Sequence, residues 1–196
     1  MLKRKIDKYL EEWKASVDKK PLIVKGARQV GKTASIRYFG EKYYNNIVEI
    51  NFALQPKYKQ IFADGYEVDS IIKNITLLNP TLVFVPHETL LFFDELQEYP
   101  DCATSLKSFK QDGRYDVICS GSLMGLYYQQ IESNSVGYKT DYEMYSLDFE
   151  EFLWAKGYDE HFINDLYQHM LELKPLSNMQ MDVLGGLFSD YMILGG

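Results

Sequence analysis

Hydrophobic positions along the first half of the chain alternate between the spacing of strands and that of helices. The apolar runs at 22–24 and 89–93 are short and continuous, as in buried parallel strands, and 47–53 is apolar at every second residue. Apolar residues recur every three or four positions at 2–16 and 68–78, which indicates amphipathic helices. Alternating strands and helices predict an α/β domain with a parallel sheet.

The remaining elements follow from the same patterns. A helix is expected from Lys32 to about Phe39, with Gly40 as its stop, and short helical turns are expected between 55 and 65. The first helix should carry Leu2, Ile6, Leu10 and Trp13 on one stripe that faces the core, and the last helix has Leu184, Leu187, Tyr191 and Ile193 in its apolar set. The other expected elements are a helix at 101–112, a strand at 115–119, a polar loop at 132–140, a strand at 141–147, and helices starting at 148 and spanning 159–173 and 179–194.

A glycine-rich stretch separates the first strand from the next helix. Residues 26–33 read Gly-Ala-Arg-Gln-Val-Gly-Lys-Thr and fit the phosphate-binding pattern G-x-x-x-x-G-K-[ST]. Glycines let backbone N–H groups surround phosphate oxygens, and the helix N-terminus adds positive potential. We expect Lys32 to reach the β- and γ-phosphates of ATP and Thr33 to ligate Mg²⁺. The predicted nucleotide-binding residues are Gly26, Ala27, Arg28, Gln29, Val30, Gly31, Lys32, Thr33 and Ala34.

Two carboxylates follow the apolar run at 89–93. Asp94 and Glu95 stand where a buried parallel strand reaches the carboxyl edge of its sheet. In P-loop enzymes an aspartate at this place holds Mg²⁺, and an adjacent glutamate can polarise the attacking water. An apolar run ending in Asp-Glu is common in proteins. The pair indicates a catalytic role here only because the phosphate-binding loop is also present.

Polar residues also follow the strand at 115–119. A serine at this strand end, Ser120 or Ser122, can lie beside Asp94 and sense the γ-phosphate. Serine-rich turns are equally ordinary capping sequences, and Ser122 can instead cap a helix that reaches Tyr128. The sequence leaves open which serine, if either, has a catalytic role.

Length, composition and charge limit the number of domains and the classes of binding partner that the chain can have. A chain of 196 residues suffices for one α/β domain with a small added element. The net charge of −7 does not favour nucleic acid, and the locally basic residues 3–8 fit a solvated helix face better than a binding patch. Cys102 and Cys119 lack metal-ligand spacing and are expected to be reduced. No signal peptide or membrane span is evident, so the cytoplasm is the expected compartment.

Four stretches in chain order carry a family resemblance. They are the loop at 26–33, Phe-Phe-Asp-Glu-Leu-Gln at 92–97, Ser-Gly-Ser at 120–122 and Leu-Asp-Phe-Glu-Glu-Phe-Leu at 147–153. Together they resemble the prokaryotic AAA-type P-loop ATPases that are generally described only as ATP-binding proteins. The resemblance implies a P-loop NTPase three-layer α/β/α fold whose five parallel strands have the order 5-1-4-3-2, followed by a helical lid region and usually by a nuclease-like C-terminal domain.

The resemblance also implies roles for individual residues, and they agree with the chemistry above. Relatives commonly place a basic residue directly after a Val-Gly pair before the fifth strand, whereas Tyr138 follows Val136-Gly137 here. This departure does not favour an arginine finger, a cation that contacts the γ-phosphate, in that loop. The remaining candidates, Arg37 and Arg114, fit ordinary surface positions better. A finger can also come from a missing domain or another subunit. The implied roles are phosphate binding by Lys32, Mg²⁺ binding by Thr33 and Asp94, water activation by Glu95, and sensing by Ser120 or Ser122.

The expected domain organisation has three parts. Residues 1–20 should form a helix on the core, 21–153 the P-loop ATPase core, and 154–196 a helical lid segment. The chain ends at Gly195-Gly196 directly after an apolar helix, so we expect this segment to begin a longer C-terminal region.

Three functions compete at this point. The first is an AAA ATPase that hydrolyses Mg·ATP as a molecular switch or motor on an unknown protein client. The second is a nucleotide-binding interaction module with little turnover. The third, a small-molecule kinase, is disfavoured by the Asp94-Glu95 pair. A homo-oligomer stays open, as does nucleic acid through a missing C-terminal domain, and no membrane is expected as a partner.

Overall fold

The computed structural model describes residues 2–122, 131 and 134–194. The chain forms two compact units, Tyr9–Met144 and Met1–Lys8 with Tyr145–Gly196, which we call the sheet unit and the helical unit. These bounds differ from the division expected at 20/21 and 153/154. The first residues join the helical unit because the Arg4 guanidinium lies 3.0 Å from the Glu151 carboxylate.

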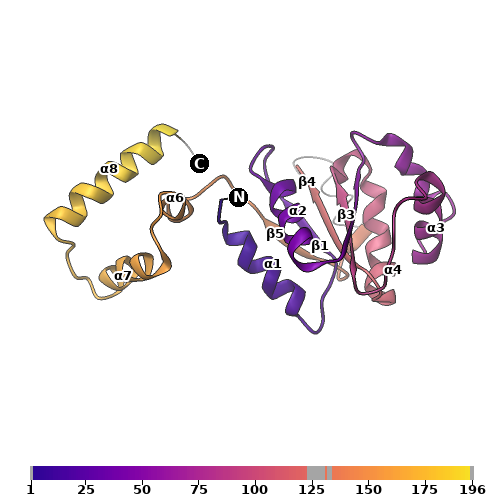
Figure 1. The fold of residues 1–196 in the computed structure, drawn as a ribbon, viewed down its shortest axis with the longest axis horizontal. Coiled ribbons are helices and arrows are strands. Elements are labelled where there is room, and N and C mark those ends of the chain that lie inside the picture. Colours follow the sequence, from indigo (N-terminus) through magenta and orange to yellow (C-terminus); the bar gives the residue numbers. More distant parts are fainter. Residues whose placement is uncertain (1, 123–130, 132–133, 195–196) are drawn as a thin grey trace. The chain divides into compact units, whose positions relative to one another are not determined.

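The sheet unit contains five parallel strands in the order β2-β3-β4-β1-β5 (Figure 1). This confirms the predicted order 5-1-4-3-2, counted from the other edge. The strand predicted at 141–147 is shorter than expected and spans Thr140–Glu143, because β1, on which it pairs, ends at Lys25 opposite Glu143. The strands are β1 (Leu22–Lys25), β2 (Asn46–Asn51), β3 (Thr89–Asp94), β4 (Asp116–Gly121) and β5 (Thr140–Glu143).

Strand register brings distant parts of the chain to one edge of the sheet. Asn51 at the end of β2 lies opposite Asp94 at the end of β3. Lys25 at the end of β1 lies opposite Gly121 of β4. The phosphate-binding loop, the carboxylate pair and the serine turn therefore leave the sheet at the same, carboxyl edge.

Helices cover both faces of the sheet (Figure 1). On one face lie α2 (Lys32–Tyr43) and the part of α1 (Lys5–Ala15) from Tyr9 onward, where the Trp13 and Phe39 rings meet with centroids 6.2 Å apart. On the other face, α3 (Val68–Leu78) and α4 (Ser105–Asp112) contribute Ile71 and Leu106 to the main core. Short 3-10 helices occupy Pro56–Phe62, Leu96–Glu98 and Pro100–Thr104.

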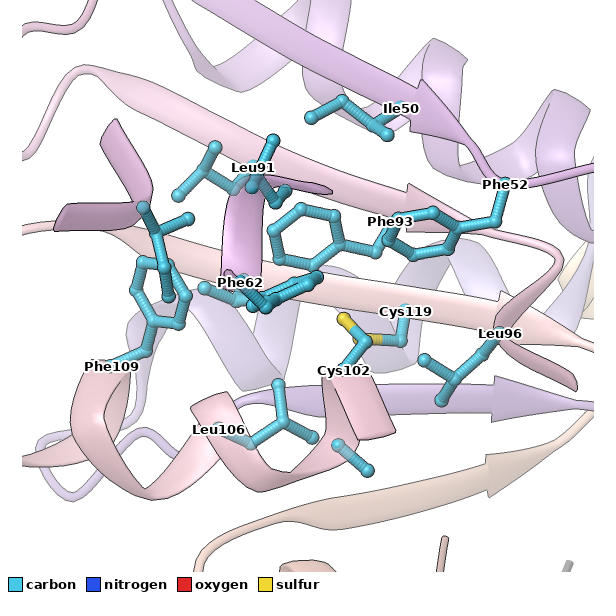
Figure 2. Packing of buried hydrophobic residues seen from close by; sticks show 14 of the residues in the cluster. Ile50, Phe52, Phe62, Leu91, Phe93, Leu96, Cys102, Leu106, Phe109 and Cys119 are labelled. Atoms are coloured by element: carbon cyan, nitrogen blue, oxygen red, sulfur yellow. The ribbon is translucent and has the colours of Figure 1, made fainter. Parts of the chain in front are cut away.

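The main core lies between the sheet and α3, α4 and the 3-10 helix at Pro56–Phe62. Figure 2 shows Phe93 of β3 beside Phe52, and their rings stack with centroids 5.9 Å apart. Successive strand residues face opposite sides of the sheet, so Leu90 and Phe92 of β3, which are also buried, face the side that α1 and α2 cover. Cys102 and Cys119 are free and buried here, as expected from their spacing.

Several local predictions need correction. Helix α2 continues to Tyr43, and Gly40 lies buried inside it. A Cβ at Gly40 would lie 2.6 Å from the Ile47 Cδ1 atom, so this glycine serves close packing against β2 and is no stop. The first helix begins only at Lys5, which leaves Leu2 exposed. The helix predicted at 101–112 is a 3-10 helix followed by α4. The helix that Ser122 was expected to cap lies outside the described residues.

The helical unit contains α6 (Phe149–Ala155), α7 (Glu160–Leu171) and α8 (Asn178–Leu194). Asp148 caps α6 in a reciprocal capping box with Glu151, and Asp159 caps α7 by accepting from the Phe162 N–H. Helix α8 has no buried residue, so its predicted apolar set is not buried, and Ile193 is 82% exposed. Within the described part of the chain, no helix is long and apolar enough to cross a membrane.

Candidate functional site

The phosphate-binding loop is shaped by its backbone. It starts where β1 ends, and Gly26 lies so close to β5 that an added Cβ would be 2.0 Å from the Met144 carbonyl oxygen. Gln29 and Gly31 have φ angles of 65° and 99°, in the left-handed region that reverses the chain direction. Such alternation of backbone conformation turns successive N–H groups toward one point, as in anion-binding nests.

Lys32 lies at the start of α2 with its ammonium group inside the curve of the loop. The Nζ atom donates hydrogen bonds to the carbonyl oxygens of Gly26 at 2.9 Å and Ala27 at 2.6 Å. Burial lowers the pKa of Lys32, and the nearby carboxylates of Glu95 and Asp94 act in the opposite direction. The cation is thus held by two neutral carbonyls, which phosphate oxygens can replace as partners.

The other predicted loop residues differ in exposure. Ala27, Arg28, Gln29 and Ala34 are exposed, whereas Val30 is buried and anchors the loop to the protein. Ala34 lies in the first turn of α2, where its backbone N–H belongs to the positive end of the helix.

Asp94 is only 4% exposed and is surrounded by the side chains of Thr33, Asn51 and Ser120, which together with Asp94 we call the carboxylate cluster. Its oxygens accept hydrogen bonds from the Ser120 hydroxyl, from Asn51 Nδ2 at 2.9 Å and from Thr33 Oγ1 at 3.3 Å. Among the residues that the structure describes, no cation forms an ion pair with this carboxylate. A buried carboxylate with only neutral donors is a favourable place for a cation.

Thr33 and Asp94 together fit a magnesium ion. The Thr33 hydroxyl lies 3.3 and 3.5 Å from the two Asp94 oxygens, so a hydroxyl and a carboxylate converge at the start of α2. Mg²⁺ prefers such hard oxygen ligands and usually completes its shell with water and substrate phosphates. The described residues contain no group of three or more His, Cys, Asp or Glu side chains that could hold a metal ion.

Glu95 follows directly and adopts an unusual backbone conformation. Its φ and ψ angles are 57° and 50°, the left-handed region that non-glycine residues avoid. This turn ends β3 and begins the 3-10 helix at Leu96–Glu98. The Glu95 carboxylate accepts a hydrogen bond from the Gln97 side-chain amide. Backbone strain of this kind is often concentrated at functional sites.

The structure distinguishes the two serines geometrically. The Ser120 hydroxyl is buried and donates to Asp94. Ser122 instead donates its main-chain N–H to Gln97 Oε1 at 3.2 Å. Ser120 is therefore the serine whose side chain belongs to the carboxylate cluster.

The two arginine-finger candidates are both bound to carboxylates. Arg37 makes two hydrogen bonds of 2.6 Å with Glu49. Arg114 reaches Asp69 and Asp112, each at 2.6 Å. These contacts give both arginines a structural explanation within the sheet unit.

Sequence reasoning missed two polar residues of this site, Asn51 and Gln97. Asn51 holds Asp94 through its amide and also accepts from the N–H groups of Ala53 and Leu54. A usable signal existed, because parallel strands align their carboxyl ends and Asn51 is the last residue of β2. Gln97 lies beyond a strand end in a 3-10 helix, and its one signal was its place in the stretch 92–97 that carries the family resemblance, to which no role was attached.

Comparison with protein families places the chain. The profile described as "AAA domain" matches residues 18–153, which is more than half of the sequence. The chain belongs to this AAA domain family. Membership agrees with the P-loop fold seen here and supports nucleotide binding and ATPase activity in general. No curated protein matches the chain.

Solved structures give more distant similarities to this AAA domain. The structure of C. elegans PCH-2 matches at 11% identity with a TM-score of 0.47, over 89% of this chain and 48% of that chain. The structure of Drosophila ORC bound to DNA matches at 15% identity with a TM-score of 0.49, over 85% of this chain and 48% of that chain. The present chain thus corresponds to about half the length of either protein.

Proposed function

We propose that this AAA domain binds Mg·ATP, hydrolyses it, and uses the nucleotide state as a switch or motor acting on a protein client. The observation that carries the proposal is the meeting of Thr33 from the phosphate-binding loop with Asp94 from β3. Family membership supports the nucleotide, and the adjoining Glu95 supports hydrolysis. Cytoplasmic localisation and the nuclease-like C-terminal domain stay predictions.

The proposed chemistry divides among the residues of the site. The loop N–H groups and Lys32 bind the β- and γ-phosphates, and Glu95 orients a water molecule toward the γ-phosphorus. As the water oxygen bonds to the γ-phosphorus, a proton of the water passes to the Glu95 carboxylate, the bond from phosphorus to the β–γ bridging oxygen breaks, and ADP leaves with that electron pair. Thr33 and Asp94 would hold Mg²⁺, which neutralises charge on the phosphate oxygens. Ser120 keeps Asp94 oriented through its hydroxyl.

Phosphate release by purified protein tests hydrolysis. Glu95→Gln should bind a fluorescent ATP analogue as the wild type does but release phosphate about a hundredfold more slowly, because the water loses its acceptor. Lys32→Ala should lose both binding and turnover. Glu41→Gln, at an exposed position of α2, is the matched control and should behave as the wild type. Equal background rates for the wild type and Glu95→Gln would contradict hydrolysis.

The switch can be tested without knowing the client. Glu95→Gln should hold ATP, so its amide hydrogen exchange can be compared between the ATP-bound and ADP-bound states. We expect different exchange rates in residues 145–194 for the two nucleotides, because a switch must respond to the γ-phosphate. Identical rates throughout these residues would argue against a switch.

A nucleotide-binding interaction module with little turnover is the second candidate. It is favoured by the carboxylate partners of Arg37 and Arg114, which engage both arginines proposed for catalysis. Such a module would bind ATP with Lys32 yet show no difference in phosphate release between the wild type and Glu95→Gln. The same assay therefore separates the two functions.

A further inference from the structure

Gln97 bridges two parts of the carboxyl edge of the sheet. Its side-chain nitrogen donates a hydrogen bond to the Glu95 carboxylate, and its side-chain oxygen accepts one from the Ser122 N–H at 3.2 Å. The bridge joins the residue after β3 to the residue after β4. One half-buried side chain thus connects two strand ends.

Hydrogen-bonding capacity fixes the orientation of the Gln97 amide. An ionised carboxylate only accepts and a backbone N–H only donates, so the NH₂ group must face Glu95 and the oxygen must face Ser122. Rotating the amide by half a turn would break both bonds and oppose like groups. The orientation therefore follows from the chemistry of the neighbours.

Glu95 needs support of this kind. Its carboxylate ends a flexible side chain, and ordering such a side chain costs conformational entropy. Within the described part of the chain, the Gln97 amide is the one hydrogen-bond donor to this carboxylate. Asn51, by contrast, donates to Asp94. The two carboxylates are thus oriented by different amides.

We propose that Gln97 is a positioning residue that holds the Glu95 carboxylate in the geometry required to orient the attacking water. This inference rests on the proposed ATP hydrolysis. Gln97 acts through Glu95, so its removal should lower turnover while leaving nucleotide binding to the phosphate loop unchanged.

The bridge also connects both carboxylates, Asp94 and Glu95, to the end of the same strand. Ser120 of β4 donates directly to Asp94, and Ser122 two residues later holds Gln97 and through it Glu95. The metal-binding and water-orienting carboxylates are therefore both aligned to the end of β4. This shared anchor explains why a glutamine, with both a donor and an acceptor, suits position 97.

Steady-state ATP hydrolysis of three variants tests the inference. Gln97→Leu removes both bonds and should lower kcat about tenfold, with the KM for ATP within about twofold of the wild-type value. Gln97→Glu keeps the acceptor for Ser122 but opposes two carboxylates, so its kcat should fall at least as far. Gln111→Leu, on the exposed surface of α4, is the matched control and should keep the wild-type kcat.

A double-mutant cycle distinguishes positioning from general structural support. In the Glu95→Gln background, Gln97→Leu should cause little further loss, because the carboxylate that it positions is gone. Unfolding midpoints of all variants establish that they fold. If Gln97→Leu does not fold, the isosteric variant Gln97→Glu is assayed in its place.

Each outcome has a definite meaning. Wild-type kcat in the folded Gln97 variants would overturn the inference alone, provided that Glu95→Gln is slower than the wild type. A full tenfold loss in the Glu95→Gln background, or a loss confined to KM, would overturn positioning in favour of a structural role. Equal rates for the wild type and Glu95→Gln would overturn the proposed function and this inference together.

Discussion

Each unit of the chain buries a carboxylate, and the two are stabilised differently. Asp94 in the sheet unit and Glu151 in the helical unit are both 4% exposed. Glu151 lies 3.0 Å from the Arg4 guanidinium and accepts from the N–H groups of Lys5 and Asp148 at 2.7 and 3.2 Å. Asp94 has only neutral donors.

This difference separates a structural charge from a functional one. A buried carboxylate that has a cation and backbone donors completes its own environment, so its removal should affect folding. A buried carboxylate whose hydrogen-bond donors are all neutral, and on which a cation such as Lys32 acts only without direct contact, is less fully compensated and favours binding of a cation from solution. The four predictions below test this distinction, beginning with the largest expected effect.

Asp94→Asn should abolish most Mg-dependent hydrolysis while preserving the fold. We expect phosphate release to fall about a hundredfold or more, because the amide is a poor Mg²⁺ ligand, whereas the unfolding midpoint without nucleotide should stay the same or rise. Chelation of Mg²⁺ should lower the wild-type rate to a similar level. A midpoint several degrees below that of the wild type would show that Asp94 is structural.

Arg4→Met should destabilise the helical unit. Removing the cation leaves Glu151 buried and unpaired, a change that typically costs about 3–5 kcal/mol in the free energy of unfolding. The double variant Arg4→Met with Glu151→Leu should recover much of that loss, as measured by denaturant unfolding. If Arg4→Met alone unfolds like the wild type, the ion pair is not the stabilising contact.

The backbone of Glu95 allows a comparison of strain with function, because its left-handed conformation should lower the free energy of unfolding. Glu95→Gly should be more stable than Glu95→Ala by about 1 kcal/mol, because glycine adopts a positive φ without steric strain. Both variants lack the carboxylate and should be inactive, so thermal unfolding is the measurement. Equal midpoints would show that the observed φ of 57° carries no cost.

Asp148→Ala should have the smallest effect. It removes the helix cap and half of the capping box on α6, which typically costs about 1 kcal/mol. Asp148→Ser keeps a capping oxygen and loses only the ion pair with Lys5, whose two side chains are 42% and 47% exposed. We expect Asp148→Ser to unfold within a few tenths of a kcal/mol of the wild type, because such exposed ion pairs contribute little. The reverse order would assign the stability to the ion pair.

The sequence predicted the parts of the fold and site that depend on local pattern. The family resemblance implied the strand order, and the approach of Thr33 to Asp94 follows from a fixed loop motif and a continuous apolar run that ends in Asp-Glu. Gly40 was misinterpreted because a helix-ending glycine and a close-packed glycine look alike locally. Only the position of Ile47 on the neighbouring strand distinguishes them.

Other features depend on contacts between distant residues and could not be predicted from local pattern. Gln97 accepts a hydrogen bond from the N–H group of Ser122, which lies 25 residues further along the chain, and such a contact leaves no periodic signal. The pairing of Arg4 with Glu151 likewise joins the N-terminus to α6 and moves the unit boundary away from the expected one. The spacing predicted an apolar set on α8, but it could not show whether another element covers that set, and no residue of α8 is buried.

The tight contact between Gly26 and Met144 bears on how mutational scans of this loop are interpreted. Intolerance at Gly26 would ordinarily be taken as evidence that the loop binds phosphate. Here any side chain at that position would collide with the Met144 carbonyl oxygen, with or without nucleotide. Substitutions at Gly26 therefore report on the packing of the loop against Met144, whereas Lys32 is the position at which a substitution tests the proposed nucleotide binding.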